Sequence, residues 1–192
     1  DYLRNEGVLN YDQLDYRGID PLGDVWKRIW TDIKTYFGDG IQFYPNDILQ
    51  LVDIIVKHSW VPDVLIFQYV FSDMYKHSNE EEIIQFINKL AGFLNLYDEK
   101  PIYILCNDIN LSKSMGGGRE FFDILESKVE NPKIVRKMHF DNINRDRHYE
   151  YGDQYNSNAL VFNNITDDIR NAYNPFESCA SAQILIKKER SD

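Results

Sequence analysis

The side chains of this sequence that could do chemistry stand directly after its short apolar runs. Acidic, amide and hydroxyl residues follow four such runs, at Asp20, Asn46 with Asp47, Ser72 with Asp73, and Asn107 with Asp108. In an open α/β sheet, ligands bind beyond the carboxyl ends of the parallel strands, so these residues would meet at one edge. Carboxylates and amides at that edge could hold hydroxyl groups, amino groups or a hard cation. Asp and Asn also cap helices that follow strands, and this structural role stays open for each position.

The spacing of the apolar residues predicts the elements that would position these side chains. Runs typical of strands alternate with helical stripes as far as residue 130, a pattern that requires crossover connections and a parallel sheet. The predicted strands of this part are 15–19, 41–44, 63–71 and 101–106. Because the run 63–71 is almost continuously apolar, we expect both faces of that strand to be buried.

Two helices carry further signals. Ser78 and Glu81 have the spacing of a capping box, and apolar residues recur at helical spacing after them, from Ile83 to Leu94. Trp26 and Trp30 belong to the apolar stripe of an earlier helix, so we expect both indoles in the core.

The alternation stops after residue 130. Residues 134–140, 158–165 and 181–188 are predicted strands without helices between them, so the end of the chain should be antiparallel. We therefore expect one domain over 1–192, with βα units in 15–130 and, in 131–192, antiparallel strands with a long polar surface loop.

Composition excludes several function classes. The net charge of −10 and the pI near 4.8 disfavour broad nucleic-acid binding. No apolar run is long enough for a membrane helix, so no membrane partner is expected. Cys106 and Cys179 stand in or beside apolar runs, which indicates buried thiols of a reducing compartment and a cytoplasmic protein. No motif with the spacing of metal ligands is present, and no resident metal is expected.

Four segments, in this order, resemble motifs of the class I S-adenosylmethionine-dependent methyltransferases. They are YRGID, IQFYPNDI, PDVLIFQYVFSDM and the closing pair NALVFNNI and SAQILIKK. The resemblance implies an α/β, Rossmann-like fold: a mostly parallel sheet with helices on both faces and a C-terminal antiparallel hairpin formed by the closing pair. It also implies S-adenosylmethionine as the cofactor and a methyl acceptor that the motifs leave unknown.

The same resemblance assigns roles to residues. Asp20 would hold the ribose hydroxyls, and Asp47, with Asn46 beside it, would meet the adenine amino group. The methyl-donor pocket would be lined by Gln68, Tyr69, Phe71 and Ser72. The region in which these enzymes recognise substrate corresponds to an aromatic and polar segment with Tyr149, Tyr151 and Tyr155, although these tyrosines could equally cover the edge of the last hairpin. No residue is assigned as the general base.

One departure from the family pattern shapes the functional hypothesis. No Gly-rich loop precedes Asp20, so we expect the first strand and its loop upstream of residue 1, with 1–14 as the remnant of the first helix and loop. A neighbouring copy of the chain is the other source of a strand that would complete the sheet. The alternative to an enzyme is a catalytically inactive, methyltransferase-like binding or scaffolding module of a larger protein.

Two further sites stay open as minor alternatives. Gly116 to Gly118 could form a phosphate loop at the start of a helix, but no Lys-Ser/Thr follows the glycines, which favours an ordinary flexible loop. Asp73, Asn107 and Asp108 could supply hard oxygen ligands to Mg²⁺, although capping and turn roles explain the same residues.

Overall fold

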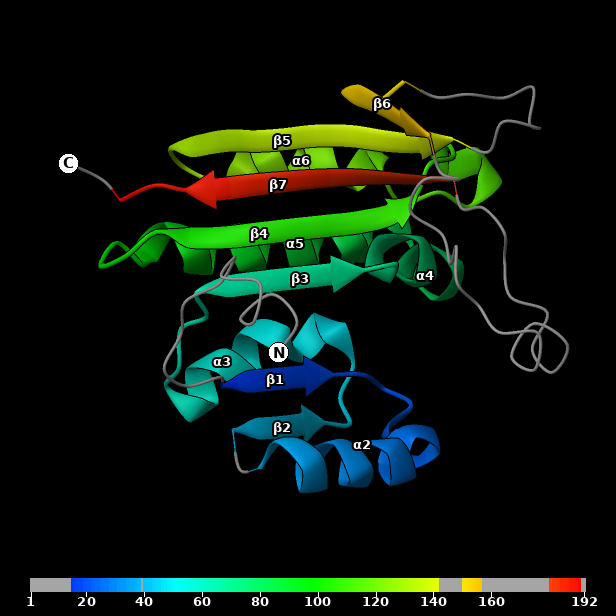
Figure 1. Cartoon of the computed structure of the whole chain (residues 1–192). Helices are drawn as coiled ribbons and strands as arrows, with labels where there is room; N and C mark the ends of the chain where they lie inside the picture. The colour runs from blue at the N-terminus through cyan, green and yellow to red at the C-terminus, as the bar shows by residue number, and fades with distance from the viewer. Residues whose placement is uncertain (1–14, 39, 142–149, 157–179, 191–192) are drawn as a thin grey trace, which may run out of the picture. The chain divides into compact units, whose positions relative to one another are not determined.

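Two separate sheets organise the chain. The computed structural model describes residues 15–38, 40–141, 150–156 and 180–190, which belong to two compact units, Asp1–Ser59 and Trp60–Asp192. The sheet of the first unit has two strands and that of the second has five (Figure 1). Three of the five strand pairings within the described ranges are parallel, so the α/β class predicted from the alternation is confirmed.

The first unit is a parallel β-α-β arrangement. Strand β1 (Tyr16–Ile19) pairs with β2 (Ile41–Tyr44), and the connection between them is helix α2 (Gly23–Phe37). A 3₁₀ turn, η1 (Ile48–Gln50), then leads into α3 (Leu51–His58). Both strand predictions in this unit are confirmed.

The apolar stripe of helix α2 is wider than the two-stranded sheet that packs against it. Trp30 is half-buried and stacks on Phe43 of β2, with ring centroids 4.7 Å apart. Trp26 remains 39% exposed and Val25 70% exposed, so the prediction of a core position is wrong for Trp26. The physical reason is the width of the sheet, since two strands cannot cover the whole stripe.

The second unit contains a mixed sheet in the order β3-β4-β7-β5-β6. Its strands are β3 (Val64–Gln68), β4 (Ile102–Ile109), β5 (Pro132–Asp141), β6 (Asp153–Asn156) and β7 (Ser181–Lys188). β3 runs parallel to β4, and β5 runs parallel to β6. β7 lies antiparallel between β4 and β5, so the predicted antiparallel C-terminal pairing is confirmed.

The partner of β7 differs from the predicted one. The segment 158–165 lies outside the described residues, but both edges of β7 are already paired along its length, one with β4 and the other with β5. The C-terminal antiparallel pair is therefore β5 with β7.

Helices of the second unit pack on one face of this sheet. They are α4 (Val70–His77), α5 (Glu80–Leu96) and α6 (Glu120–Lys128), with a 3₁₀ turn, η2 (Lys113–Met115), before α6. Phe67 of β3 contacts Phe71 of α4 and Phe86 of α5, and α5 and α6 lie behind the strands in Figure 1. On the other face, Val64 and Ile66 are 52% and 60% exposed. The prediction that both faces of this strand are buried is therefore wrong, because all the described helices of this unit stack on the side of Phe67.

Two element boundaries also differ from the predictions. β3 ends at Gln68 rather than at residue 71, because Tyr69 adopts the left-handed conformation (φ 57°, ψ 24°) and α4 begins at the next residue. The capping box of α5 lies one residue later than predicted, with Asn79 as the N-cap and Glu82 as its reciprocal partner. Within the described ranges, no helix is long and apolar enough to cross a membrane.

Candidate functional site

The carboxyl ends of β1 and β2 bring Asp20 and Asp47 to the same edge of the first sheet. The strands are parallel, with Ile19 opposite Tyr44, so the residues that follow them emerge side by side. This confirms the predicted common edge for the two carboxylates.

Each of these acidic side chains has a local structural contact. A carboxylate oxygen of Asp20 accepts a hydrogen bond from the backbone N–H of Leu22 at 2.7 Å. Asp47 caps η1 by accepting from the backbone N–H of Leu49 at 2.9 Å, and the amide of Asn46 donates to Gln50 at 2.8 Å. A local hydrogen bond thus occupies one oxygen of each carboxylate, as a cap of η1 for Asp47 and as a turn contact before α2 for Asp20.

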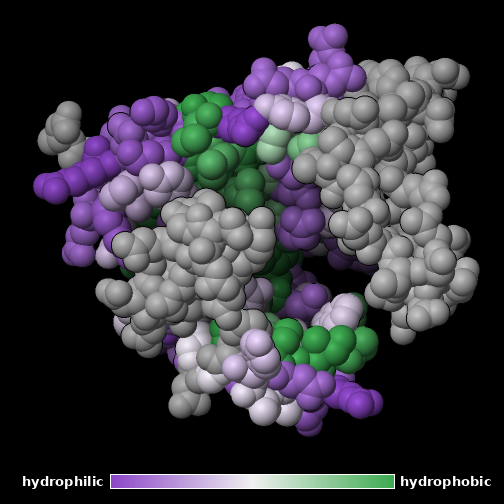
Figure 2. Space-filling model, viewed as in Figure 1, coloured by the Kyte–Doolittle hydropathy of each residue, from purple (hydrophilic) through white to green (hydrophobic). Residues whose placement is uncertain are grey.

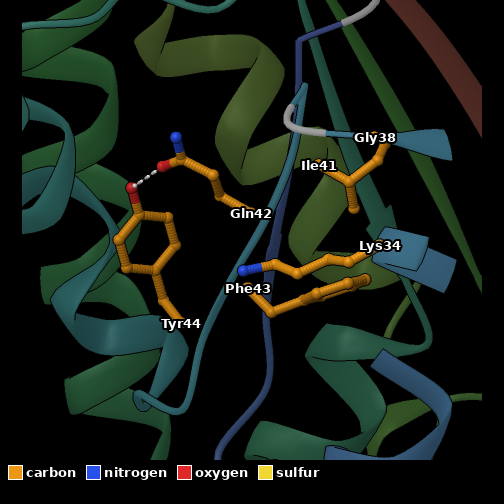
Figure 3. A pocket seen from close by; sticks show the side chains of 6 residues that line it. All are labelled: Lys34, Gly38, Ile41, Gln42, Phe43 and Tyr44. Carbon is orange, nitrogen blue, oxygen red and sulfur yellow. Dashed lines mark hydrogen bonds between the residues drawn. The ribbon is translucent and has the colours of Figure 1, made fainter. Parts of the chain in front are cut away.

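A hollow of about 430 Å³ lies beside β2, away from these carboxylates. Its lining is Lys34, Gly38, Ile41, Gln42, Phe43 and Tyr44, and the side chain of Lys34 runs along Phe43 (Figure 3). The hydroxyl of Tyr44 donates to Gln42 at 2.9 Å. Arg17 of β1 also donates to Gln42, at 3.4 Å, and the ion pair of this guanidinium with Asp15 raises the pKa of Arg17. Neither Asn46 nor Asp47 lines the hollow, so it does not coincide with the predicted cofactor residues.

A buried carboxyl group joins the end of β4 to the first turn of α4. Asp108 is fully buried, and its Oδ2 accepts from the backbone N–H of Ser72 in the first turn of α4 at 3.0 Å. Its Oδ1 accepts from the backbone N–H of Ile109 at 2.7 Å. Tyr69, the N-cap residue of α4, provides no side-chain cap, so Asp108 supplies the acceptor from the neighbouring strand. Burial raises the pKa of Asp108, and the hydrogen bonds from Ser72 and Ile109 oppose that rise.

Two glycines before α6 are tightly packed, Gly118 against this carboxyl group and Gly117 against the backbone of Leu111. A Cβ at Gly118 would lie 2.5 Å from both Asp108 Oδ2 and the backbone nitrogen of Ser72. A Cβ at Gly117 would lie 1.9 Å from the carbonyl oxygen of Leu111. The glycines therefore permit close packing on the end of the sheet, and a phosphate at this point would meet a carboxyl group instead of free N–H donors.

The residues assigned to the methyl-donor pocket separate into two groups. Phe71 is fully buried among aromatic rings, including Phe121 at 6.0 Å, and has no surface for a ligand. Ser72 is also buried, and its hydroxyl donates to the carbonyl of Tyr69 at 3.3 Å. Gln68 is exposed at the end of β3, and Tyr69 is partly exposed and donates from its backbone to the carbonyl of Asn107. Of the four, Gln68 and Tyr69 therefore present surface to a ligand.

The residues considered for Mg²⁺ do not form a cluster. Asp73 lies on the exposed side of α4 and faces His77 at 3.8 Å, whereas Asp108 is buried as the cap of the same helix. No group of three or more His, Cys, Asp or Glu side chains in the described ranges could hold a metal ion.

The tyrosines assigned to substrate recognition lie in different surroundings. Tyr149 falls outside the described residues. Tyr151 is buried, with its ring edge-on to Phe122 and its hydroxyl 3.5 Å from Asp123, and burial raises the pKa of the phenol. Tyr155 of β6 is 37% exposed and lies beneath the guanidinium of Arg136, 4.9 Å from the ring centroid. Tyr151 thus has a packing role, and Tyr155 is the tyrosine that a ligand could reach.

The strand register also reveals one polar residue, Gln183, that motif spacing did not single out. Gln68, Asn107 and Gln183 are direct partners across β3, β4 and β7. Gln183 stands in the middle of a predicted strand, so only the register of β7 could have identified it.

Comparisons with known proteins give structural likenesses but no match in sequence. No protein-family model and no curated protein matches the chain. A solved S-adenosylmethionine-dependent methyltransferase from Methanosarcina mazei is 13% identical, with a TM-score of 0.41 over 91% of this chain and 82% of that protein. A likeness at this TM-score does not establish a common function.

Proposed function

We propose that this chain is a domain of an S-adenosylmethionine-dependent methyltransferase that acts on an unidentified acceptor. The observation that carries the proposal is the position of β7, which runs antiparallel between β4 and β5 in a sheet whose β3-β4 pair is parallel. An antiparallel closing strand distinguishes this class of methyltransferase from ordinary dinucleotide-binding sheets. The order of the sequence motifs supports the same assignment.

The carboxylates at the ends of β1 and β2 fit the cofactor chemically. Asp20 is half-buried, and its second oxygen accepts no hydrogen bond from the described residues, so it can accept from a ribose hydroxyl. Asp47 is exposed and uses one oxygen as the cap of η1, so its other oxygen can accept from an amino group. The cofactor, when bound, supplies an electrophilic methyl group.

The second unit, taken by itself, has two accessible side chains that could orient an acceptor. Gln68 and Tyr69 stand at the end of β3, where they would orient the group that accepts the methyl. Transfer by direct displacement depends chiefly on the alignment of donor and acceptor, so this proposal needs no general base among the described residues.

The test is calorimetric titration of S-adenosylhomocysteine into the protein expressed from its native gene. Asp20→Ala should weaken binding by about 2 to 3 kcal/mol, the scale of hydrogen bonds to a charged group. Asp24→Ala is the matched control, because Asp24 is an exposed carboxylate in the first turn of α2. Equal affinities for the native protein and the Asp20 variant would remove Asp20 from the site.

A further inference from the structure

The hollow of about 430 Å³ beside β2 lies at an edge of that strand. Its lining includes Gln42 and Phe43, neighbours in β2 whose side chains point to opposite faces of the sheet (Figure 3). A hollow that touches both faces lies at a strand edge, and β1 already occupies the other edge of β2. Gln42 and Lys34 are both exposed, and Figure 2 shows hydrophilic and apolar side chains next to one another on the surface of this unit. The hollow is therefore open to a ligand, and its volume is in the range of pockets that bind small molecules.

A hydrogen-bond network fixes the orientation of the Gln42 amide. The Oε1 atom of Gln42 accepts from the hydroxyl of Tyr44 at 2.9 Å and from the guanidinium of Arg17 at 3.4 Å. Because a guanidinium has only N–H donors, the amide atom that faces Arg17 is the oxygen. The Nε2 atom of Gln42 makes no hydrogen bond to the described residues. The amide therefore has two N–H donors left for a ligand.

The lining also carries one positive charge that no described residue compensates. The guanidinium of Arg17 is already neutralised by Asp15, through a pair of hydrogen bonds at 2.8 Å and 3.1 Å. Lys34, in the last turn of α2, makes no ion pair with the described residues. Its side chain runs along Phe43 toward β2, as the close view of the hollow shows (Figure 3). The ammonium group of Lys34 and the amide of Gln42 thus give the hollow donors and a single net positive charge.

We propose that this hollow binds a small carboxylate anion. The carboxylate would accept hydrogen bonds from the ammonium group of Lys34 and from Nε2 of Gln42. The amide of Gln42 is held by its network, whereas the exposed side chain of Lys34 can turn toward the same anion. One uncompensated cation suits a monoanion, while a phosphate group carries about −1.5 to −2 charges at pH 7. The site does not rest on the proposed methyltransferase function, because neither Asp20 nor Asp47 lines the hollow.

Benzoate is a suitable probe, because the aromatic rings of Phe43 and Tyr44 belong to the lining, and benzamide is its neutral counterpart of similar shape. In ¹⁵N-labelled protein from the native gene, benzoate should shift the side-chain amide signals of Gln42 and the backbone amide signal of Phe43 in a saturable manner. Benzamide should leave these signals in place. Lys34→Gln should raise the Kd for benzoate at least about tenfold, the factor expected for one lost hydrogen bond to a charged group. Lys34→Arg keeps the charge and should retain binding.

Lys27→Gln is the matched control for the loss of charge. Lys27 is an exposed lysine of the same helix, roughly two turns before Lys34, and does not line the hollow. This variant should leave the Kd for benzoate unchanged. Inorganic phosphate, titrated separately, should bind more weakly than benzoate. Absence of a saturable shift, an equal response to benzamide, tighter binding of phosphate, or an unchanged Kd in Lys34→Gln would overturn the proposal.

Titration with S-adenosylhomocysteine distinguishes this proposal from the proposed function. A benzoate response without S-adenosylhomocysteine binding would keep the carboxylate site and remove the methyltransferase assignment. S-adenosylhomocysteine binding without a benzoate response would keep the methyltransferase assignment and overturn the carboxylate site.

Discussion

Replacement of Gly118 by Ala tests the buried junction between α4, β4 and the loop before α6. The new Cβ would lie 2.5 Å from Asp108 Oδ2 and from the nitrogen of Ser72, the two atoms that form the cross-strand cap. Ordinary van der Waals contact begins at 3.4 Å, so each atom would have to retreat by about 0.9 Å. The nitrogen of Ser72 is backbone, and Asp108 Oδ2 belongs to a buried carboxyl group that two backbone N–H groups hold in place.

The expected cost follows from the contacts that the methyl group would disrupt. Forcing a methyl into a packed site costs about 1 to 3 kcal/mol. Loss of the hydrogen bond from Ser72 to the carboxyl group costs about 1.5 to 3 kcal/mol. The lower entropy of the unfolded chain with Ala returns about 0.4 to 1 kcal/mol. The free energy of unfolding should therefore fall by about 2 to 5 kcal/mol.

Urea unfolding followed by far-UV circular dichroism measures this loss, and hydrogen exchange at the amide of Ser72 reports the cap itself. Gly92→Ala is the matched control, since Gly92 lies on the exposed side of α5 and a Cβ there would meet nothing within 4 Å. The control should raise stability by about 0.5 to 1 kcal/mol, because Ala is the better helix former. Equal stability of the Gly118 variant and the native protein, with unchanged protection of Ser72, would refute the packing described at this junction.

Three further predictions concern buried side chains. Burial raises the pKa of Asp108 above its unfolded value. The folded protein therefore gains stability from the protonated carboxyl group in acid and loses it as the pH rises through the folded pKa. Asp108→Asn should flatten this part of the pH profile of the unfolding free energy. Phe71→Ala should lower the unfolding free energy by about 3 to 5 kcal/mol in urea denaturation, and a loss under 1 kcal/mol would show that Phe71 is not in the core. Lys188→Met should cost about 1 to 3 kcal/mol in the same assay, because the buried ammonium donates to the carbonyl of Tyr97 at 2.8 Å. Lys187→Met, which removes the solvated pair with Glu189, should leave stability nearly unchanged, and equal costs for the two variants would contradict this difference.

Periodicity identified most of the elements because the signals are local. The helical stripe before Phe37 and the apolar run after Pro101 each reflect the spacing of residues within one element. The end of β3 lacked such a signal. Tyr69 adopts a left-handed conformation, which usually requires Gly or Asn. Because the run 63–71 contains no residue that typically ends a strand, the first residues of α4 were predicted as strand.

The long-range features could not be predicted from spacing. Ile184 pairs with Cys106 across 78 residues, and no local pattern specifies that β7 enters the sheet between β4 and β5. The same holds for the cap that Asp108 supplies to Ser72 from another strand. The acidic residues at the strand ends were predicted as candidate ligand-binding groups, with capping as the alternative. Spacing could not show that Asp108 is buried as a cap, whereas Asp20 remains partly exposed.

We propose that the protein binds S-adenosylmethionine at the edge formed by β1 and β2. Titration of the ¹⁵N-labelled protein from its native gene with S-adenosylhomocysteine, and separately with NAD, tests this claim most directly. We expect saturable shifts of the backbone amides of Asp20 and Asp47 with S-adenosylhomocysteine and none with NAD. Shifts with NAD alone, or no response of these amides to S-adenosylhomocysteine, would contradict the claim.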